Sequence, residues 1–459
     1  MIEKKQGLPP LYEQIYRQLK AEIVTGERRA GEKLPSKRRM AERLAVSLIT
    51  VENAYAQLLA EGYITSKEKK GYYVCTIEPV PQLLCQHPVY RAPQPVQYEI
   101  DMRTDRSDNR RFPTAQWCRL SRKVMTEQSA GIFRAGSACG LRELRGEIAA
   151  YLKRNRSLDV SPDCIIVGAG TEYLCDLLVK LLGSYRVYGV ENPGYRKVAA
   201  LYQSSGARCF YLPLDDGGLA MQPLRASPVE VLHLSPNHQY PTGLVTTAAR
   251  RFELLSWAAE REGRYIVEDD YDSEFRFDTR PCGTMLAEDS NERVIYMNTF
   301  SKTIAPSLRI GYLVLPPHLM DLYLKKFDCF SCTVSNLEQL TLAEFIGSGQ
   351  YERHISRMRK YYRQRREQFF SQIRAAAPPQ KLRITENDAG LHFLLSFSSP
   401  YSDRQIKEQA LSQGIALSFL SDFSYYPDTT FAHALVVNYG GIDAADFQKV
   451  LSFLQMVWQ

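Results

Sequence analysis

The 459-residue chain lacks any run of about 18 apolar residues, the length that a membrane-spanning helix requires. No apolar stretch follows its first seven residues, so we expect no secretory signal. Ten cysteines are too few for a disulfide scaffold in a chain of this length. These absences exclude a membrane protein and a disulfide-rich secreted protein, and they predict a cytoplasmic location.

Metal and redox motifs are also scarce. The seven histidines follow no ligand spacing, and the pair Cys329 and Cys332 lacks the second pair that a zinc site requires. With 44% hydrophobic and 24% charged residues, the chain has the composition of a folded protein of two or three domains. We therefore expect structural thiols and no metal site.

Positive charge is concentrated at one end of the chain. Residues 1–75 contain 14 lysines and arginines against 9 glutamates and no aspartate, whereas the whole chain has a net charge of +7. This asymmetry favours an anionic partner for the N-terminal end.

Residues 9–75 have the pattern of a small helical domain with a hairpin. Apolar residues recur at helical spacing from Tyr12 to Ile23, and Ser36 and Ser47 are suited to cap two further helices. Residues 62–74 contain two short strand patterns around a lysine-rich tip. A helix, a turn, a second helix and a basic hairpin form a winged helix-turn-helix, which binds double-stranded DNA.

In that arrangement the helix after Ser47 enters the major groove, while basic side chains bind phosphates. The alternative is an ordinary three-helix bundle with a charged surface. The residues that we predict to bind DNA are Ser36, Lys37, Arg38, Arg39, Ser47, Thr50, Asn53, Lys67, Lys69 and Lys70.

Five prolines between residues 76 and 97 predict an extended linker. From residue 98 to residue 459, strand and helix patterns alternate, which is typical of an α/β fold with a mainly parallel sheet. A basic run from Arg357 to Arg366 has the pattern of a solvated helix face, and a second DNA-contacting surface is the less favoured interpretation.

The segment from Thr299 to Tyr312 is the most informative part of the second domain. Lys302 lies between hydroxyl residues, and Arg309 follows seven residues later. Such a lysine can form a Schiff base with a carbonyl cofactor, while the arginine and the hydroxyls bind a phosphate. A surface lysine in a polar loop is the alternative.

Three further segments fit the same cofactor. Gly168-Ala169-Gly170-Thr171 joins a strand to a helix and can bind an anion at the helix N-terminus. Asp269 follows another strand and can pair with a protonated pyridine nitrogen, although Asp270 is a close rival. Tyr271 can donate to a phenolic oxygen, and Tyr195 can stack on a flat ring.

The motifs of residues 9–75, including Leu34-Pro35-Ser36 and Glu61-Gly62-Tyr63-Ile64, resemble the GntR family of winged-helix regulators. One departure is Leu48, where that family usually has arginine. Residues 98–459 resemble fold-type I, aspartate-aminotransferase-like enzymes that use pyridoxal 5′-phosphate (PLP). The combination resembles the MocR family of transcriptional regulators.

This resemblance implies that Lys302 is the residue that forms the internal aldimine with PLP. It also implies operator DNA as a partner, a small-molecule effector that is either PLP itself or an amine or amino acid, and a domain-swapped homodimer. The cofactor-binding residues that it assigns are Gly170, Thr171, Tyr195, Tyr240, Asp269, Tyr271, Thr299, Ser301, Lys302 and Arg309.

Two departures bear on whether the domain is an enzyme. Val436 occupies the position where aminotransferases have the arginine that binds the substrate carboxylate, and Ala135 replaces a tyrosine that reaches the partner's phosphate. Three functions remain open: a PLP-dependent sensor that regulates transcription, a working aminotransferase with a DNA-binding accessory domain, and a regulator with an inert dimerisation scaffold. The departures favour the sensor.

Overall fold

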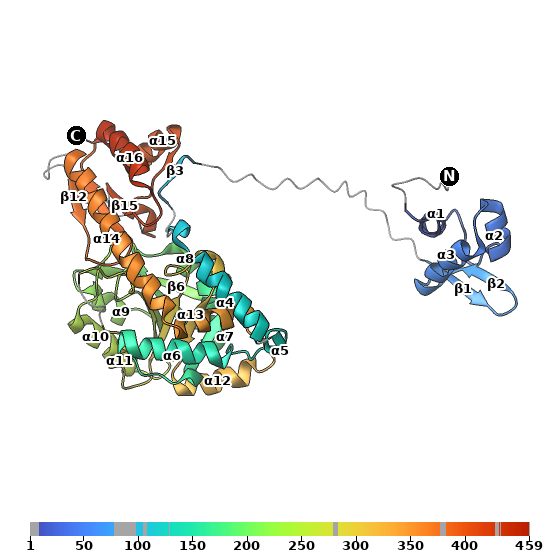
Figure 1. Cartoon of the computed structure of the whole chain (residues 1–459), viewed down its shortest axis with the longest axis horizontal. Coiled ribbons are helices and arrows are strands. Elements are labelled where there is room, and N and C mark those ends of the chain that lie inside the picture. Colours follow the sequence, from blue (N-terminus) through green and yellow to red (C-terminus); the bar gives the residue numbers. More distant parts are fainter. Residues whose placement is uncertain are drawn as a thin grey trace. The chain divides into compact units, whose positions relative to one another are not determined.

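The computed structural model describes residues 9–77, 98–103, 108–127, 129–278, 283–376, 382–426, 431 and 433–458. The chain divides into two compact units, Met1–Pro95 and Val96–Gln459 (Figure 1). Residues 78–97, which make up most of the predicted linker, lie outside the described residues. Within the described part, no helix is long and apolar enough to cross a membrane.

The N-terminal unit consists of three helices and a hairpin around its own core. Its elements are α1 (Leu11–Val24), α2 (Lys37–Leu44), α3 (Leu48–Ala60), β1 (Ile64–Lys67) and β2 (Gly71–Val74). The Ser36 and Ser47 hydroxyls accept hydrogen bonds from the backbone amides of Arg39 and Thr50, so both serines cap helices as predicted. Val51, Tyr55 and Leu58 on α3 are fully buried beneath α1 and α2.

An eight-stranded sheet forms the centre of the C-terminal unit. Its order is β4-β11-β10-β9-β8-β5-β6-β7. The strands β10, β9, β8, β5 and β6 pair in parallel, whereas β11 is antiparallel to both neighbours. The strands are β4 (Ile165–Gly168), β5 (Val187–Asn192), β6 (Arg208–Asp215), β7 (Gly218–Leu219), β8 (Val231–Leu234), β9 (Tyr265–Asp269), β10 (Val294–Thr299) and β11 (Gly311–Val314).

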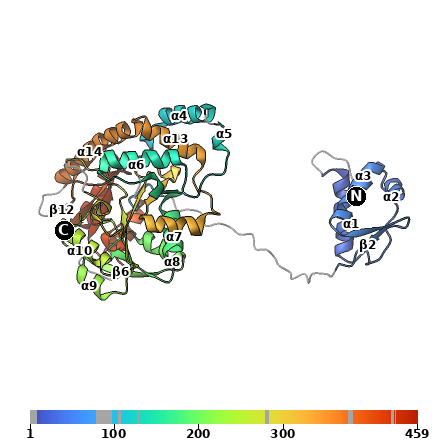
Figure 2. The ribbon, with the colours of Figure 1, turned by 90° about the horizontal axis from the view of Figure 1, so that it is seen from below.

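Helices cover both faces of this sheet. Figure 2 shows α4, α6 and α13 on one side and α7 and α8 on the other. In β4, Ile165 and Val167 pack toward the first group, whereas Ile166 packs toward the second, as the period of two in a strand requires. The helices of the large part are α4 (Thr114–Glu127), α5 (Ser129–Ile132), α6 (Arg142–Arg156), α7 (Gly170–Leu182), α8 (Arg196–Ser204), α9 (Met221–Ala226), α10 (Ala248–Ala259), α11 (Met285–Glu288), α12 (Pro317–Phe327) and α13 (Asn336–Gly347).

A smaller part follows, built on the antiparallel sheet β12-β13-β15. The long helix α14 connects it to the large part and packs against α16. The elements of the smaller part, with the connecting helix, are β3 (Ile100–Asp101), α14 (Gln350–Ala376), β12 (Leu382–Thr385), β13 (His392–Phe397), α15 (Asp403–Ser412), β14 (Ile415–Ala416), β15 (Ala434–Asn438) and α16 (Ala444–Val457). Short 3-10 turns lie at Asn109–Arg111 (η1), Pro162–Cys164 (η2), Pro306–Leu308 (η3) and Leu420–Phe423 (η4).

The basic run on α14 is not a continuous solvated face. Arg365 and Arg366 are buried and paired with carboxylates, and Arg359 donates to the carbonyl of Glu274. The prediction of a solvated face was therefore wrong for these three arginines. Their acceptors come from other elements, Asp443 and Asp388 in the smaller part and Glu274 after β9, which helical periodicity alone does not reveal.

Candidate functional site

The start of α3 presents the side chains expected to reach DNA bases. Asn53 is exposed, whereas the Thr50 hydroxyl lies 2.7 Å from that of Ser47. Ile49, which the sequence interpretation passed over, is 67% exposed beside them. An exposed apolar side chain at the start of a recognition helix can contact a thymine methyl group.

Basic side chains flank this helix. Arg38 and Arg39 on α2 are exposed, and so are Lys67, Lys69 and Lys70 at the hairpin tip. Lys37 is different, because its ammonium lies 3.3 Å from the Glu52 carboxylate and above the ring of Tyr72. The geometry therefore makes Lys37 the least available of the predicted phosphate contacts.

In the C-terminal unit, a cavity of about 430 Å³ lies at the edge of the sheet where the parallel strands end. Parallel α/β sheets bind ligands at this edge. Strands β9 and β10 lead directly into it with Asp269 and Thr299. Of the ten predicted cofactor residues, nine line the cavity, and they are Thr171, Tyr195, Tyr240, Asp269, Tyr271, Thr299, Ser301, Lys302 and Arg309.

The tenth residue, Gly170, lies beside the cavity at the first position of α7. Its φ of +79° suits glycine, and a Cβ there would lie 3.2 Å from the guanidinium of Arg309. Arg309 itself has a left-handed backbone with φ of 50°. The absent side chain thus leaves room for Arg309 at the N-terminus of α7, where helix amides and a guanidinium together can bind a phosphate.

Glu172 on the first turn of α7 pairs with both cations at this end of the cavity. Its Oε2 lies 2.8 Å from Arg309 Nη2, and its Oε1 contacts the ammonium of Lys197. The hydrogen bond from Lys197, together with the charge of Arg309, lowers the pKa of Glu172 despite partial burial. An ionised carboxylate therefore competes for the arginine that would bind a phosphate.

Asp269 is held by a chain of buried side chains. His233 Nε2 on β8 lies 3.4 Å from Asp269 Oδ2, and the Tyr202 hydroxyl on α8 lies 2.7 Å from His233 Nδ1. All three residues are buried. These hydrogen bonds orient the Asp269 carboxylate at the cavity wall. Sequence reasoning missed them because the three residues come from three separate elements.

Asp270 has a structural role instead. It forms a buried ion pair with Arg156 (2.6 Å) and accepts hydrogen bonds from Asn237 (2.7 Å), Tyr296 (2.6 Å) and Ser273 (2.9 Å). It does not line the cavity. The geometry therefore favours Asp269 over its rival as the residue facing a ligand.

Tyr271 lies next to a cluster of buried polar groups. Its hydroxyl lies 3.2 Å from His238 Nδ1, which is also 2.8 Å from Asp272 Oδ2. The ring of His392 lies 4.6 Å from that of His238, and burial lowers the pKa of His392 well below its usual value. These contacts fix Tyr271 beside the cavity.

Aromatic side chains form the outer wall of the cavity. Tyr195 and Tyr240 are in edge contact at 5.6 Å, and Phe423 packs against Tyr240 at 5.3 Å. Arg103 also lines the cavity and pairs with Asp101 at 2.9 Å. Sequence reasoning missed Arg103 and Phe423, since no motif surrounds either residue.

Neither Val436 nor Ala135, the two departures from the aminotransferase pattern, places a cation or a hydroxyl in the cavity. Val436 is buried in β15 within a small apolar cluster that includes Leu394 and Leu420. Ala135 is exposed, next to Phe133, which is 84% exposed. Among the described residues, the lysines and arginines that line the cavity besides Lys302 are Arg103, Lys197 and Arg309, and each pairs with a carboxylate.

Comparisons with known proteins match the two units to two different families. Residues 11–74 match the model of bacterial regulatory proteins of the gntR family, and residues 106–449 match the model of aminotransferases class I and II. The chain is therefore a transcriptional regulator in which a GntR-type DNA-binding unit precedes an aminotransferase-like unit.

Its full-length relatives have the same organisation. The regulator YdeL of Bacillus subtilis is 33% identical, with 98% of this chain and 97% of that protein covered. The probable rhizopine catabolism regulatory protein MocR of Rhizobium meliloti is 33% identical, with 97% and 93% covered. The pyridoxine biosynthesis regulator PdxR of Corynebacterium glutamicum is 30% identical, with 96% and 94% covered. The chain belongs to this MocR-type family.

Among solved structures, the kynurenine aminotransferase of Pyrococcus horikoshii matches with a TM-score of 0.68. It is 23% identical, and the match covers 77% of this chain and 89% of that one. At this identity the likeness establishes the fold alone. The C-terminal unit thus has the fold of a fold-type I aminotransferase.

Proposed function

We propose that the C-terminal unit binds PLP and that the cofactor, or an amine that reacts with it, controls operator binding by the N-terminal unit. The observation that carries this proposal is the convergence of Lys302, Asp269, Tyr271 and Arg309 on one cavity. These groups come from two separate stretches of sequence, residues 269–271 and 302–309, and a scaffold without a ligand has no need to gather them.

The residues present fit the cofactor. The space left by Gly170, the N-terminus of α7 and Arg309 suit its phosphate, and Asp269 suits its pyridine nitrogen. A bound PLP supplies an aldehyde that condenses with the amine of Lys302. With PLP bound, the Tyr271 hydroxyl would hold a proton near the phenolic oxygen, and the Tyr195 ring would cover the ring of the cofactor.

The cations around the cavity favour sensing over turnover. Arg309 is the cation that we assign to the cofactor phosphate, Arg103 and Lys197 are each paired with a carboxylate, and Val436 offers no charge. A free amino-acid carboxylate would have to displace one of these pairs. PLP itself, or an amine without a carboxylate, is therefore the effector that we propose.

The second candidate is a working aminotransferase. The match of residues 106–449 to aminotransferases of class I and II supports it. Turnover of amino acids by the PLP-loaded protein, measured as keto-acid release, separates the two functions: the sensor forms less than one product per site within the assay, whereas an enzyme forms many.

We further propose that the protein is a cytoplasmic homodimer. Met125 near the end of α4 and Phe133 directly after α5 are 52% and 84% exposed, and a partner subunit would cover them. Light scattering of the pure protein measures its mass in solution and tests this state.

The central experiment is a PLP titration followed by DNA binding. Purified protein should develop an absorbance band in the region of ~400 nm on adding PLP, and Lys302→Ala should abolish it. Operator affinity, measured on the DNA upstream of the gene, should then differ with and without PLP in the wild type and not in Lys302→Ala. A band that survives Lys302→Ala unchanged contradicts the proposal.

A further inference from the structure

A second cavity of about 450 Å³ lies on the C-terminal unit where α4, α13 and α14 meet. Three guanidinium groups line it, from Arg119 on α4 and from Arg353 and Arg357 on α14. The remaining lining residues are Ala115, Gln116, Phe345 and Gln350, so none of the described lining residues is acidic. We call this feature the arginine pocket.

The arginines of this pocket have no countercharge in the described part of the chain. Arg119 and Arg357 form no ion pair there, and Arg353 donates only to the carbonyls of Ser348 and Gly349. Arg122 and Lys360 extend the positive surface along the two helices, since they follow the pocket arginines at helical spacing and are exposed.

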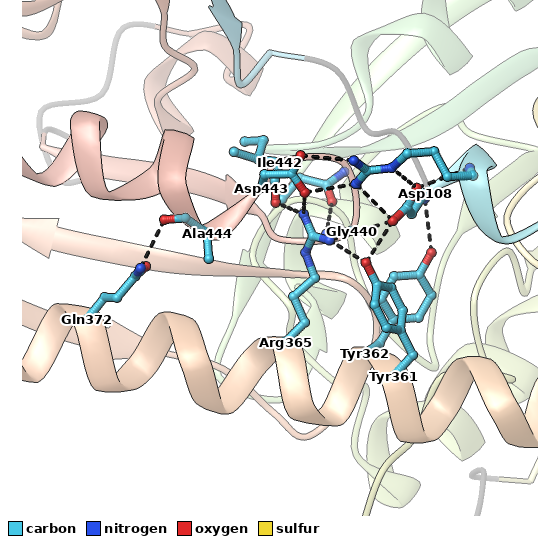
Figure 3. Close-up of polar contacts among 11 residues, drawn as sticks. Asp108, Tyr361, Tyr362, Arg365, Gln372, Gly440, Ile442, Asp443 and Ala444 are labelled. Carbon is cyan, nitrogen blue, oxygen red and sulfur yellow. Dashed lines mark hydrogen bonds and ion pairs between the residues drawn. The ribbon is translucent and has the colours of Figure 1, made fainter.

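Other arginines in and near α14 form ion pairs with aspartates. Figure 3 shows Arg365 pointing from α14 toward Asp443. Arg365 lies 3.2 Å from Asp443, and Arg110 pairs with both Asp108 and Asp443. Tyr361 completes the network through a 2.7 Å hydrogen bond to Asp108. Arg353 and Arg357 lie on the same helix, yet neither has such a partner among the described residues.

Unpaired guanidinium groups around one cavity repel one another, so their arrangement becomes favourable when an anion binds. Arginine binds phosphate through two parallel hydrogen bonds, which makes it better suited than lysine to this ligand. The pocket also lies at the first turn of α14, a 27-residue helix whose N-terminal dipole adds to the positive potential. A phosphate group is the ligand that this chemistry favours.

We propose that the arginine pocket and the adjacent Arg122 and Lys360 bind phosphates of the DNA backbone outside the segment read by α3. DNA is the favoured source because the protein already carries a GntR-type DNA-binding unit, which raises the local concentration of DNA phosphates. This inference goes beyond the proposed function and does not require a bound cofactor.

The buried face of the same helix contacts the loop that carries Lys302. The Tyr351 hydroxyl lies 3.1 Å from Thr303 Oγ1, and His354 Nε2 lies 2.9 Å from the carbonyl oxygen of Thr303. The first turns of α14 therefore contact the cofactor loop on one side and would contact DNA on the other.

The test uses the full-length protein and a mixed-sequence duplex of about 60 base pairs, with affinity measured at several salt concentrations. The triple variant Arg119→Ala, Arg353→Ala, Arg357→Ala should lower the slope of log K against log salt by about two to three. The matched control removes three exposed arginines that lie on separate elements, by Arg142→Ala, Arg208→Ala and Arg383→Ala. Its slope should stay within one unit of the wild type.

Thermal unfolding of both triple variants checks that they are folded. A slope equal to that of the wild type in the pocket variant, or an equal loss in the control, overturns the proposal. Titration with inorganic pyrophosphate distinguishes the sources of phosphate. Saturable pyrophosphate binding that the pocket variant loses, with no change in the DNA slope, would assign the pocket to small phosphorylated compounds and overturn the assignment to DNA.

Discussion

Replacing Glu172 with glutamine should tighten PLP binding. In the ligand-free protein the Glu172 carboxylate pairs with Arg309 and Lys197, and its pKa is lowered mainly by the hydrogen bond from Lys197. It is therefore ionised at neutral pH and stays next to the arginine that we assign to the cofactor phosphate. A phosphate that enters this site meets a carboxylate already paired with its arginine.

The size of the effect follows from the charges. Arg309 and Glu172 are both about 45% exposed, so a water-like dielectric constant applies. A single and a double negative charge about 6 Å apart repel by about 1.4 kcal/mol in water, and salt at physiological strength reduces this to about 0.7 kcal/mol. Glu172→Gln should then lower the Kd for PLP about threefold.

The assay is a PLP titration followed by absorbance and by quenching of tryptophan fluorescence. The matched control is Glu260→Gln, because Glu260 is also exposed and pairs with two cations, Arg225 and Arg264. Its Kd should equal that of the wild type. At 0.5 M salt the difference between Glu172→Gln and the wild type should shrink, since screening weakens the repulsion.

An unchanged or weaker PLP affinity of Glu172→Gln would refute the reasoning. It would mean that Glu172 orients Arg309 for the phosphate instead of competing with it. A wild-type protein that binds no PLP at all would instead contradict the proposed function.

Three further predictions concern stability. Burial raises the pKa of Glu191 from its usual 4.5 to about 8. The contribution of Glu191 to the stability of the folded state is therefore complete below pH 4.5 and is lost as the pH rises through 8. In urea titrations, Glu191→Gln should raise the free energy of unfolding by roughly 1–3 kcal/mol at pH 8.5 and by little at pH 5. Arg156→Met should cost about 3–5 kcal/mol by removing the ion-pair partner of the buried Asp270, and adding Asp270→Asn should recover part of this loss. Ser47→Ala should cost about 1 kcal/mol in thermal unfolding of the N-terminal unit, and an equal stability would contradict the cap.

Local sequence signals predicted the N-terminal unit well. A serine directly before a helical apolar repeat predicts a helix cap, and Ser36 and Ser47 both cap helices in the structure. The strands that end at Asp269 and Thr299 were also predictable, because buried parallel strands are short apolar runs. Motifs that follow such strands meet at one sheet edge, which is why nine predicted residues line one cavity.

Contacts between distant elements were not predictable from one sequence. Asp269 and Asp270 are neighbours in the chain, and only the alternation of side chains at the end of β9 sends one to the cavity and the other to Arg156. His233 contacts Asp269 because β8 pairs with β9. The burial of Arg365 likewise depends on Asp443, which lies 78 residues further along the chain.

The most direct test of the central claim is to identify the amine that reacts with PLP. The full-length protein is incubated with PLP, reduced with borohydride, digested and analysed by peptide mass spectrometry. The account predicts a pyridoxyl phosphate adduct on Lys302, at close to one per chain, with none on Lys197. Label spread over surface lysines, with Lys302 unmodified, would contradict it.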